Sequence, residues 1–470
     1  MKKHILRLIA VLLICAQLCF LFSCNDTQKA PNADPVTTNG ESTLLVTPPT
    51  TDAPTTDAPT TDAPTTDAPT TNAPTTDAPT TNAPTTNAPT TDAPTTDAPT
   101  TDAPTTDAPT TNAPTTDTQT QPNQIKNIIL IIGDGMGIEH ISAGQLAGGK
   151  DFGFTDWQFT NVNTDSVNSS GQGPVMTDSA AGGTALASGE LTVNGYVGKN
   201  HNGANVSTIL DKAANLNKST GVVTTDTLYG ATPGAFSAHN ISRNNSQEIF
   251  LSQLNSDVNL LCGTKDPITS NTPLIIDAGY EYCDDFSELE ETFTFDKTYW
   301  QLDLATTSAS VRLCDVAVKA LDYLNQDEDG FVLMIEQAHI DKYSHSNDFA
   351  GMVASMNSLN DTVEAILAWL GDRTDTAILI TADHETGGLT VSTEDMFSKT
   401  YHTEDGVIYY NWSTGNHTNS KVGLFVYGVQ ADFSSFRYYS SEHLIKNIDV
   451  YNLMYDILYH PIKYGSQATP

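Results

Sequence analysis

The chain has 470 residues, with 56 acidic and 21 basic side chains, so its formal net charge is −35. A charge this negative argues against recognition of nucleic acid, or of an anionic membrane surface, through charge alone. An anionic substrate would need a local concentration of positive charge from arginine, lysine or metal ions. The composition changes sharply along the chain and divides it into residues 1–24, 25–124 and 125–470.

Residues 1–24 have the pattern of an export signal, in which basic residues precede an apolar run from Leu8 to Phe22. The run is shorter than the about 20 apolar residues that a membrane-spanning helix needs. It ends in Leu21-Phe22-Ser23-Cys24, which resembles a bacterial lipobox with an acylated cysteine. We expect an exported lipoprotein, anchored to a membrane through Cys24 and facing the periplasm or the cell exterior. The alternative is a plain secretory signal in which Cys24 is incidental.

Residues 25–124 carry almost no large apolar side chains, and from Thr50 to Thr116 they repeat Pro-Thr-Thr-Asp/Asn-Ala. Proline at every fifth position prevents a helix, and nothing in the repeat can form a core. We expect a disordered, extended stalk with polyproline II character that carries residues 125–470 away from the lipid. A repeat expansion without a specific role would predict the same disorder.

Residues 125–470 are long enough for one large domain. Continuous apolar runs, typical of strands buried on both faces, alternate in them with helical patterns. The alternation predicts an α/β fold with a largely parallel central sheet and helices on both faces. The expected strands are 127–132, 219–225, 331–335, 376–381 and 422–427, and the expected helices are about 245–255, 308–325, 349–370 and 444–459.

The three cysteines of this domain, Cys262, Cys283 and Cys314, lack the spacing of a zinc-thiolate site. An exported protein can pair two of them. Cys262 with Cys283 would close the shorter loop, and the other pairings remain open.

Ligands of parallel sheets bind beyond the carboxyl ends of the strands, and polar residues follow the expected strands there. The first run ends in Gly-Asp-Gly around Asp134, and the run 376–381 is followed by Asp383 and His384, a pair typical of zinc sites. The run 331–335 leads into Glu336 and then to Asp341 and His345, whose i, i+4 spacing lets both bind one metal if the segment is helical.

A further histidine, His417, lies in a polar loop just before the last expected strand. Taken alone, these segments could be ordinary turns and solvated loops. Together they place four carboxylates in one crevice, where they would repel one another strongly. Divalent cations remove this repulsion, and two or three are needed.

The segment Thr177-Asp178-Ser179-Ala180-Ala181 predicts the start of a helix that Asp178 or Ser179 can cap. A serine at a helix N-terminus lies where an anion is favoured. The simpler interpretation is that Ser179 is only a capping residue.

Together these segments resemble the alkaline phosphatase family over most of residues 125–460. The resemblance implies a three-layer sandwich and hydrolysis of small phosphate monoesters with a broad substrate range. Ser179 would be the nucleophile that becomes phosphorylated, and inorganic phosphate and an alcohol would be released. Arg243 lies 11 residues after Thr232, the spacing of the family's phosphate-binding arginine, and Asp178 would orient it.

The resemblance also implies two zinc ions and one magnesium ion, bound by residues from the strand ends together with Ser179 and Thr232. The implied ligands are Asp341, His345 and His417 for one zinc, Asp134, Asp383, His384 and Ser179 for the other, and Asp134, Thr232 and Glu336 for magnesium.

The chain departs from the family at Gly230, two residues before Thr232, where bacterial members often have aspartate and animal members histidine. Glycine has no side chain to hold the waters of the third ion, which leaves its occupancy and identity open. Lys342 would also lack a carboxylate partner and could then reach the phosphate of the substrate more directly.

Sulfatases, phosphodiesterases and phosphomutases are related classes. A sulfatase would need a Cys/Ser-x-Pro-x-Arg context around Ser179, which the sequence lacks, and diesterases of this fold usually use threonine as the nucleophile. A tethered surface-binding protein, or an inactive relative, is the alternative outside catalysis. Dimers are common in the family, and the sequence leaves a homodimer open.

Overall fold

The computed structural model of the protein describes residues 124–289, 296–304, 310–436, 439–440 and 443–460. The expected leader with Cys24, and all of the expected stalk except its last residue, lie outside these described residues. Within them, no helix combines the length and the apolar character that a membrane span requires.

A ten-stranded sheet organises the domain, in the order β15-β2-β14-β8-β1-β7-β3-β4-β6-β5. β1 lies inside the sheet with all of its residues buried, which is why its sequence is an unbroken apolar run. It pairs in parallel with β7 and β8. The strands of this sheet are β1 (Asn127–Gly133), β2 (Gln158–Asn163), β3 (Ser219–Thr224), β4 (Leu260–Thr264), β5 (Glu281–Cys283), β6 (Thr298–Leu302), β7 (Phe331–Gln337), β8 (Thr376–Thr381), β14 (Val422–Tyr427) and β15 (Leu444–Lys446).

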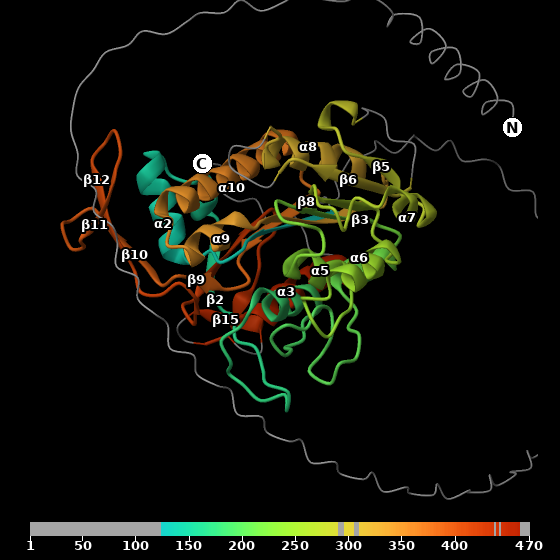
Figure 1. Ribbon diagram of the computed structural model, residues 1–470, viewed down its shortest axis with the longest axis horizontal. Helices are drawn as coiled ribbons and strands as arrows, with labels where there is room; N and C mark the ends of the chain where they lie inside the picture. Colours follow the sequence, from blue (N-terminus) through green and yellow to red (C-terminus); the bar gives the residue numbers. More distant parts are fainter. Residues whose placement is uncertain (1–123, 290–295, 305–309, 437–438, 441–442, 461–470) are drawn as a thin grey trace, which may run out of the picture. The chain divides into compact units, whose positions relative to one another are not determined.

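Helices cover both faces of the sheet. In Figure 1, α8 and α10 lie on one side of it and α3, α5 and α6 on the other. α2 and α9 pack against α10, whereas α11 packs against α3 and α4. The helices are α2 (Ile138–Gly148), α3 (Ser179–Ser188), α4 (Ile209–Ala214), α5 (Ala231–Ser237), α6 (Ser246–Leu254), α7 (Thr272–Asp277), α8 (Leu313–Leu324), α9 (His339–His345), α10 (Phe349–Leu370) and α11 (Asn447–Tyr459), with short 3-10 helices at Gly153–Asp156, Phe286–Glu288 and Phe433–Ser435.

Two small sheets are inserted between β8 and β14. One consists of β10 (Leu389–Ser392), β12 (Val407–Trp412) and β11 (Lys399–His402), and it contacts α2. The other pairs β9 (Glu385–Thr386) with β13 (His417–Thr418). This second pairing ties His417 to the segment that follows His384.

The prediction of a largely parallel sheet between helices is confirmed, with two differences at the C-terminal end. The expected helix 444–459 begins only at Asn447, because residues 444–446 form β15, and the Asp449 carboxylate accepts a hydrogen bond from the Lys446 amide at 3.0 Å. The other difference is the direction of β14, which runs antiparallel to both β2 and β8.

The direction of β14 matters for the residue that precedes it. An antiparallel strand begins at the edge where its parallel neighbours end. His417, just before β14, therefore reaches the same edge as Asp134 after β1 and Asp383 after β8. A parallel β14 would have placed His417 at the opposite edge of the sheet.

Cys262 in β4 and Cys283 in β5 lie on opposite sides of β6, and both are in register with Trp300. Two strand spacings separate them by roughly 9–10 Å, more than the about 7 Å that a disulfide allows between Cα atoms. Cys262, Cys283 and Cys314 are all free. Of the pairings that the sequence left open, Cys262 with Cys283 is therefore not formed.

We predict that protein purified without reductant carries a free thiol at each of these three cysteines. Alkylation with iodoacetamide in denaturant, followed by peptide mass spectrometry, should find all three modified before any reduction. A disulfide-linked peptide pair containing Cys262 and Cys283 would contradict the strand register.

Candidate active site

Ser179 is the first residue of α3 and is buried. The Asp178 side chain caps the helix by accepting a hydrogen bond from the Ala181 amide at 3.0 Å. The predicted helix start is confirmed, and Asp178 is the cap. Ser179 is thereby free to point its hydroxyl toward the end of β8, where Oγ lies 3.1 Å from Nε2 of His384.

The small residues of α3 let the helix approach the backbone after β8 very closely. A methyl group on Gly182 would lie 2.6 Å from the carbonyl oxygen of Asp383. On Gly183 it would lie 3.2 Å from Cβ of Ala235 in α5. This close contact determines how near Ser179 comes to Asp383 and His384.

The first group of ligating atoms gathers around Nε2 of His384. Oδ2 of Asp383 lies 3.3 Å from this nitrogen, and Oδ1 of Asp134 lies 3.5 Å from it. Both oxygens are buried and accept no hydrogen bond from the described residues. Leaving two carboxylate oxygens unpaired in a buried site is costly unless a cation binds them.

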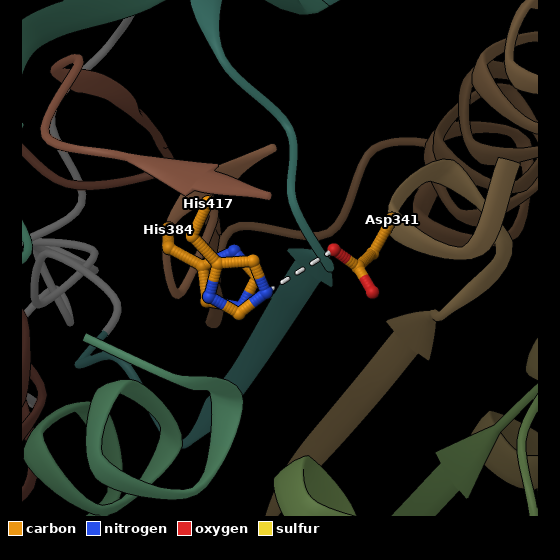
Figure 2. Close-up of side chains that lie close together, drawn as sticks. All are labelled: Asp341, His384 and His417. Carbon is orange, nitrogen blue, oxygen red and sulfur yellow. Dashed lines mark ion pairs between the residues drawn. The ribbon is translucent and has the colours of Figure 1, made fainter. Parts of the chain in front are cut away.

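The second group contains Asp341, His345 and His417. Asp341 and His345 lie one turn apart in α9, as the i, i+4 spacing predicted, with Oδ2 3.3 Å from Nε2. Nε2 of His417 lies 3.7 Å from Oδ1 of Asp341 and 3.2 Å from Nε2 of His345. Figure 2 shows the rings of His384 and His417 stacked, with His417 facing Asp341; the ring centroids are 3.6 Å apart.

Backbone carbonyl groups determine how the imidazole rings of His345 and His417 are oriented. Nδ1 of His345 lies 2.8 Å from the Gly415 oxygen, and Nδ1 of His417 lies 2.9 Å from the Thr177 oxygen. A carbonyl oxygen only accepts hydrogen bonds, so both Nδ1 atoms carry a hydrogen. In neutral rings the two Nε2 lone pairs then face each other and Asp341, an arrangement typical of metal-binding histidines.

When no cation is bound, a proton on His345 offsets the negative charge of Asp341. The hydrogen bond between His345 and Asp341 raises the pKa of His345 to about 9, although burial acts in the opposite direction. Burial tends to raise the pKa of Asp341, but the hydrogen bonds with His345 and Thr386 act against it, and that pKa is lowered.

A third group contains Glu336 and Thr232. Glu336, near the end of β7, is buried and accepts a hydrogen bond from the Thr224 hydroxyl. Burial, followed by the charge of Asp226, raises the pKa of Glu336 to about 8. Thr232 Oγ1 is also buried and makes no hydrogen bond of ordinary geometry among the described residues. The hydroxyl is nevertheless close enough to Glu336 to lower the pKa of that carboxyl group.

Burial and the charge of neighbouring carboxylates also raise the pKa values of Asp383 and Asp134. Burial, followed by the charge of Asp341, raises the pKa of Asp383 to about 6. Burial and the charge of Asp383 raise the pKa of Asp134 well above its ordinary value. Burial lowers the pKa of His384 to about 4, so that its ring is neutral at pH 7 and can act as a ligand.

Two cationic side chains reach the site. Arg243 Nη1 lies 3.2 Å from Oδ2 of Asp178, so the expected contact between these residues is present. Lys342 Nζ lies 2.5 Å from Oδ1 of Asp226. The expectation that Lys342 lacks a carboxylate partner is therefore wrong, because Asp226 supplies one from the segment after β3.

Thr386 and Asp226 also contact the site, although the sequence patterns did not predict them. The Thr386 hydroxyl donates a hydrogen bond to Oδ1 of Asp341 at 2.5 Å and lies 3.2 Å from Nδ1 of His384, so it links the two groups of ligating atoms. Its position two residues after His384 was the available signal, since alternate residues of an extended segment share a face. Asp226 offered no such signal.

The donor atoms fit metal ions. In the described part of the chain, Asp341, His384 and His417 form one group, and Asp134, Asp383 and His384 form another, whose ligand atoms all lie within 4.8 Å of one another. Imidazole nitrogens with carboxylate oxygens suit zinc. The oxygen-only group around Glu336 and Thr232 suits magnesium.

The family model described as alkaline phosphatase matches residues 125–266 and 294–423. The chain belongs to the alkaline phosphatase family. Alkaline phosphatase 4 of Bacillus subtilis is 31% identical over 312 residues, which cover 60% of this chain and 65% of that protein. The alkaline phosphatase of Escherichia coli is 27% identical over 385 residues, which cover 65% of this chain and 82% of that protein.

The chain thus spans about 65% of the length of the first of these alkaline phosphatases. Among solved structures, the alkaline phosphatase from the Antarctic bacterium TAB5 is similar, with a TM-score of 0.60 at 23% identity. The match covers 72% of this chain and 99% of the TAB5 chain. At this identity the likeness concerns the fold, and it confirms the predicted alkaline phosphatase-like sandwich.

We predict that the metal-free protein loses stability as the pH rises from about 6.5 to 8. In this range folded Glu336, with a pKa of about 8, keeps a proton that it loses near 4.5 in the unfolded chain. His345, whose pKa rises from 6.5 to about 9, acts in the same direction. Because the folded state binds more protons, its stability falls with rising pH. The melting temperature in EDTA should therefore decrease over this range.

Glu336→Gln is the matched control, because the amide is neutral at every pH. Its melting temperature in EDTA should fall less between pH 6.5 and 8. Zinc and magnesium should reverse the trend in the native protein, since they bind the deprotonated ligands. A melting temperature that rises with pH in EDTA would be inconsistent with the buried proton on Glu336.

We also predict that Gly182→Ala destabilises the protein by about 1–3 kcal/mol, because the new methyl group would press on the Asp383 backbone. Gly183→Ala is the control. Both changes bring the same gain in helix propensity, but the methyl group on residue 183 meets the side chain of Ala235 and needs only a small shift. Urea unfolding measures the difference, and equal effects of the two changes would refute the close contact.

Proposed function

We propose that this protein is an alkaline phosphatase that hydrolyses small phosphate monoesters through a phosphoserine at Ser179. Membership of the family supports the reaction class, and the relatives from B. subtilis and E. coli carry that name. The observation that carries the proposal is the position of Ser179 Oγ, 3.1 Å from Nε2 of His384 and beside the unpaired oxygens of Asp134 and Asp383.

We infer two zinc ions and one magnesium ion as cofactors. Asp341, His345 and His417 would hold one zinc, and Asp134, Asp383, His384 and Ser179 the other. Asp134, Thr232 and Glu336 would hold magnesium. Bound zinc lowers the pKa of a coordinated hydroxyl and neutralises charge on phosphoryl oxygens. A variant of the TAB5 enzyme has been solved with magnesium in its M3 site, which supports a magnesium ion in this fold.

In the proposed reaction, Arg243 binds two non-bridging oxygens of the phosphate with its planar fork. Asp178 holds the guanidinium group in place, since it contacts Arg243 and is itself fixed by the Ala181 and Gly195 amides. Ser179 lies at the start of α3, where the helix N-terminus favours the negative charge of the phosphate. Lys342 adds positive charge near the same site.

Chemistry then proceeds in two displacements. Ser179 Oγ attacks phosphorus, the Oγ–P bond forms, and the bond from phosphorus to the leaving oxygen breaks. The Ser179 proton passes to solvent, and the departing alkoxide takes up a proton. Water then attacks the phosphoserine from the same side as the alcohol left, which releases inorganic phosphate and restores Ser179.

The named contacts are all directed at the phosphoryl group, so the alcohol part of the substrate need not be recognised. A broad range of monoesters follows from this. Deprotonated ligands and a deprotonated serine are favoured at high pH, which fits an alkaline optimum.

We further propose that the enzyme acts outside the cytoplasm. Residues 1–24 would be a lipoprotein export signal with acylation at Cys24, and residues 25–124 a stalk. The catalytic domain, residues 125–470, would then face the periplasm or the cell exterior. The pattern of basic and apolar residues and the proline repeat support this arrangement. A homodimer is a further proposal, based on the family.

Ser179→Ala tests the nucleophile. We expect kcat/KM for p-nitrophenyl phosphate to fall by at least roughly 1,000-fold, because no other group takes over a lost nucleophile. Zinc content, measured by mass spectrometry of the purified protein, should remain near that of the native protein, since the imidazoles and carboxylates are unchanged.

Ser188→Ala, at the other end of α3, is the matched control and should retain normal turnover. Its hydroxyl donates a hydrogen bond to the Thr184 carbonyl and accepts one from the Glu190 amide, both at the C-terminal end of the helix. Full turnover by the Ser179→Ala variant would exclude Ser179 as the nucleophile.

A further inference from the structure

The space beside Gly230 is filled by the side chain of Asp226. A methyl group built on Gly230 would lie 3.0 Å from Oδ2 of Asp226 and 2.9 Å from the carbonyl oxygen of Thr227. Position 230 therefore has no room for a larger side chain. A carboxylate from four residues earlier in the chain takes that space.

Local hydrogen bonds hold Asp226 in this position. Its amide donates to the Thr224 hydroxyl at 2.9 Å, and its Oδ1 accepts from the Thr227 amide at 2.7 Å. Its carbonyl oxygen accepts from the Thr264 amide at 2.8 Å. The side chain is 26% exposed. It is therefore a carboxylate that hydrogen bonds hold in place, not a freely moving surface group.

The two oxygens of Asp226 have different surroundings. Oδ1 also accepts a hydrogen bond from Lys342 Nζ at 2.5 Å. Oδ2 accepts no hydrogen bond from the residues that the structure describes. A short relay leads from Asp226 to Glu336, because the Thr224 hydroxyl that accepts from the Asp226 amide itself donates to Glu336.

A second observation at this corner of the site comes from Thr232, two residues after Gly230. Its hydroxyl oxygen is buried and makes no hydrogen bond of ordinary geometry among the described residues. Glu336 is buried as well, and the Thr224 hydroxyl links it to the Asp226 amide. A hydroxyl without such a hydrogen bond and two carboxylates therefore lie at this corner.

We propose that Asp226 is a positioning residue that supplies the carboxylate absent at Gly230: Oδ1 holds Lys342, and Oδ2 would accept hydrogen bonds from the waters of a magnesium ion that Glu336 and Thr232 would hold. Magnesium in proteins keeps several of its waters, and a nearby carboxylate accepts hydrogen bonds from them. This inference rests on the proposed function, because it assumes the third cation. Asp226 would supply the carboxylate that Gly230 lacks.

Asp226→Asn tests the inference in the full chain. Magnesium affinity would be measured on zinc-loaded protein by equilibrium dialysis with metal analysis, and turnover of p-nitrophenyl phosphate in parallel. We expect magnesium to bind about 10–100-fold more weakly, the usual effect of losing a residue that supports metal ligands. Zinc content should not change.

Asp266→Asn is the matched control. Asp266 accepts a hydrogen bond from the Tyr229 hydroxyl at 3.1 Å and belongs to the same surface, but it lies outside the proposed site. Its loss should leave the magnesium affinity unchanged.

A substitution at position 230 tests the idea of replacement. Gly230→Asp should not tighten magnesium binding, because the new side chain meets Asp226 and the Thr227 carbonyl. A gain in magnesium affinity in this variant, folded and zinc-loaded, would overturn the replacement.

The outcomes separate the inference from the proposed function. Unchanged magnesium affinity in Asp226→Asn overturns the inference, as does native protein that turns over substrate with zinc but binds no magnesium. In both cases the proposed phosphatase stands. Native protein that binds neither metal and hydrolyses no monoester would instead overturn the proposed function and, with it, the inference.

Discussion

Repulsion among buried carboxylates is the constraint on which the rest of the site depends. Asp134, Glu336, Asp341 and Asp383 are all buried at one edge of the sheet. Too few hydrogen-bond donors surround them, and oxygens of Asp134 and Asp383 have none among the described residues. Protons can satisfy such a site only in part, as the raised pKa values of Glu336 and Asp383 indicate. Cations resolve the repulsion while leaving the ligands charged.

The fold supplies this edge through close packing. Glycines in α3 let the helix rest on the backbone after β8, which brings Ser179 to His384. Backbone carbonyls of Thr177 and Gly415 orient the two imidazoles of the second group. The reactive atoms are thus positioned by rigid elements and main-chain groups, which is how a site keeps its geometry without a bound ligand.

Two ion pairs contain the cationic side chains named for the site. Asp178 contacts Arg243, and Asp226 contacts Lys342. Both carboxylates are also fixed by backbone amides, Asp178 by Ala181 and Asp226 by Thr227. The net charge of the protein is −35, so the proposed binding of an anionic substrate would depend on such fixed cationic side chains.

The sequence by itself determined the alternation of strands and helices, because strands buried on both faces need unbroken apolar runs. It also determined the chemistry at the strand ends, because Asp134, Asp383 with His384, and the i, i+4 pair Asp341 and His345 are local patterns. Only the tertiary structure decided that β14 is antiparallel, which brings His417 to the site, and that Cys262 and Cys283 stay apart. Only the fold likewise gave Lys342 its partner Asp226, 116 residues away. Such contacts depend on how distant segments pack, which no local pattern encodes.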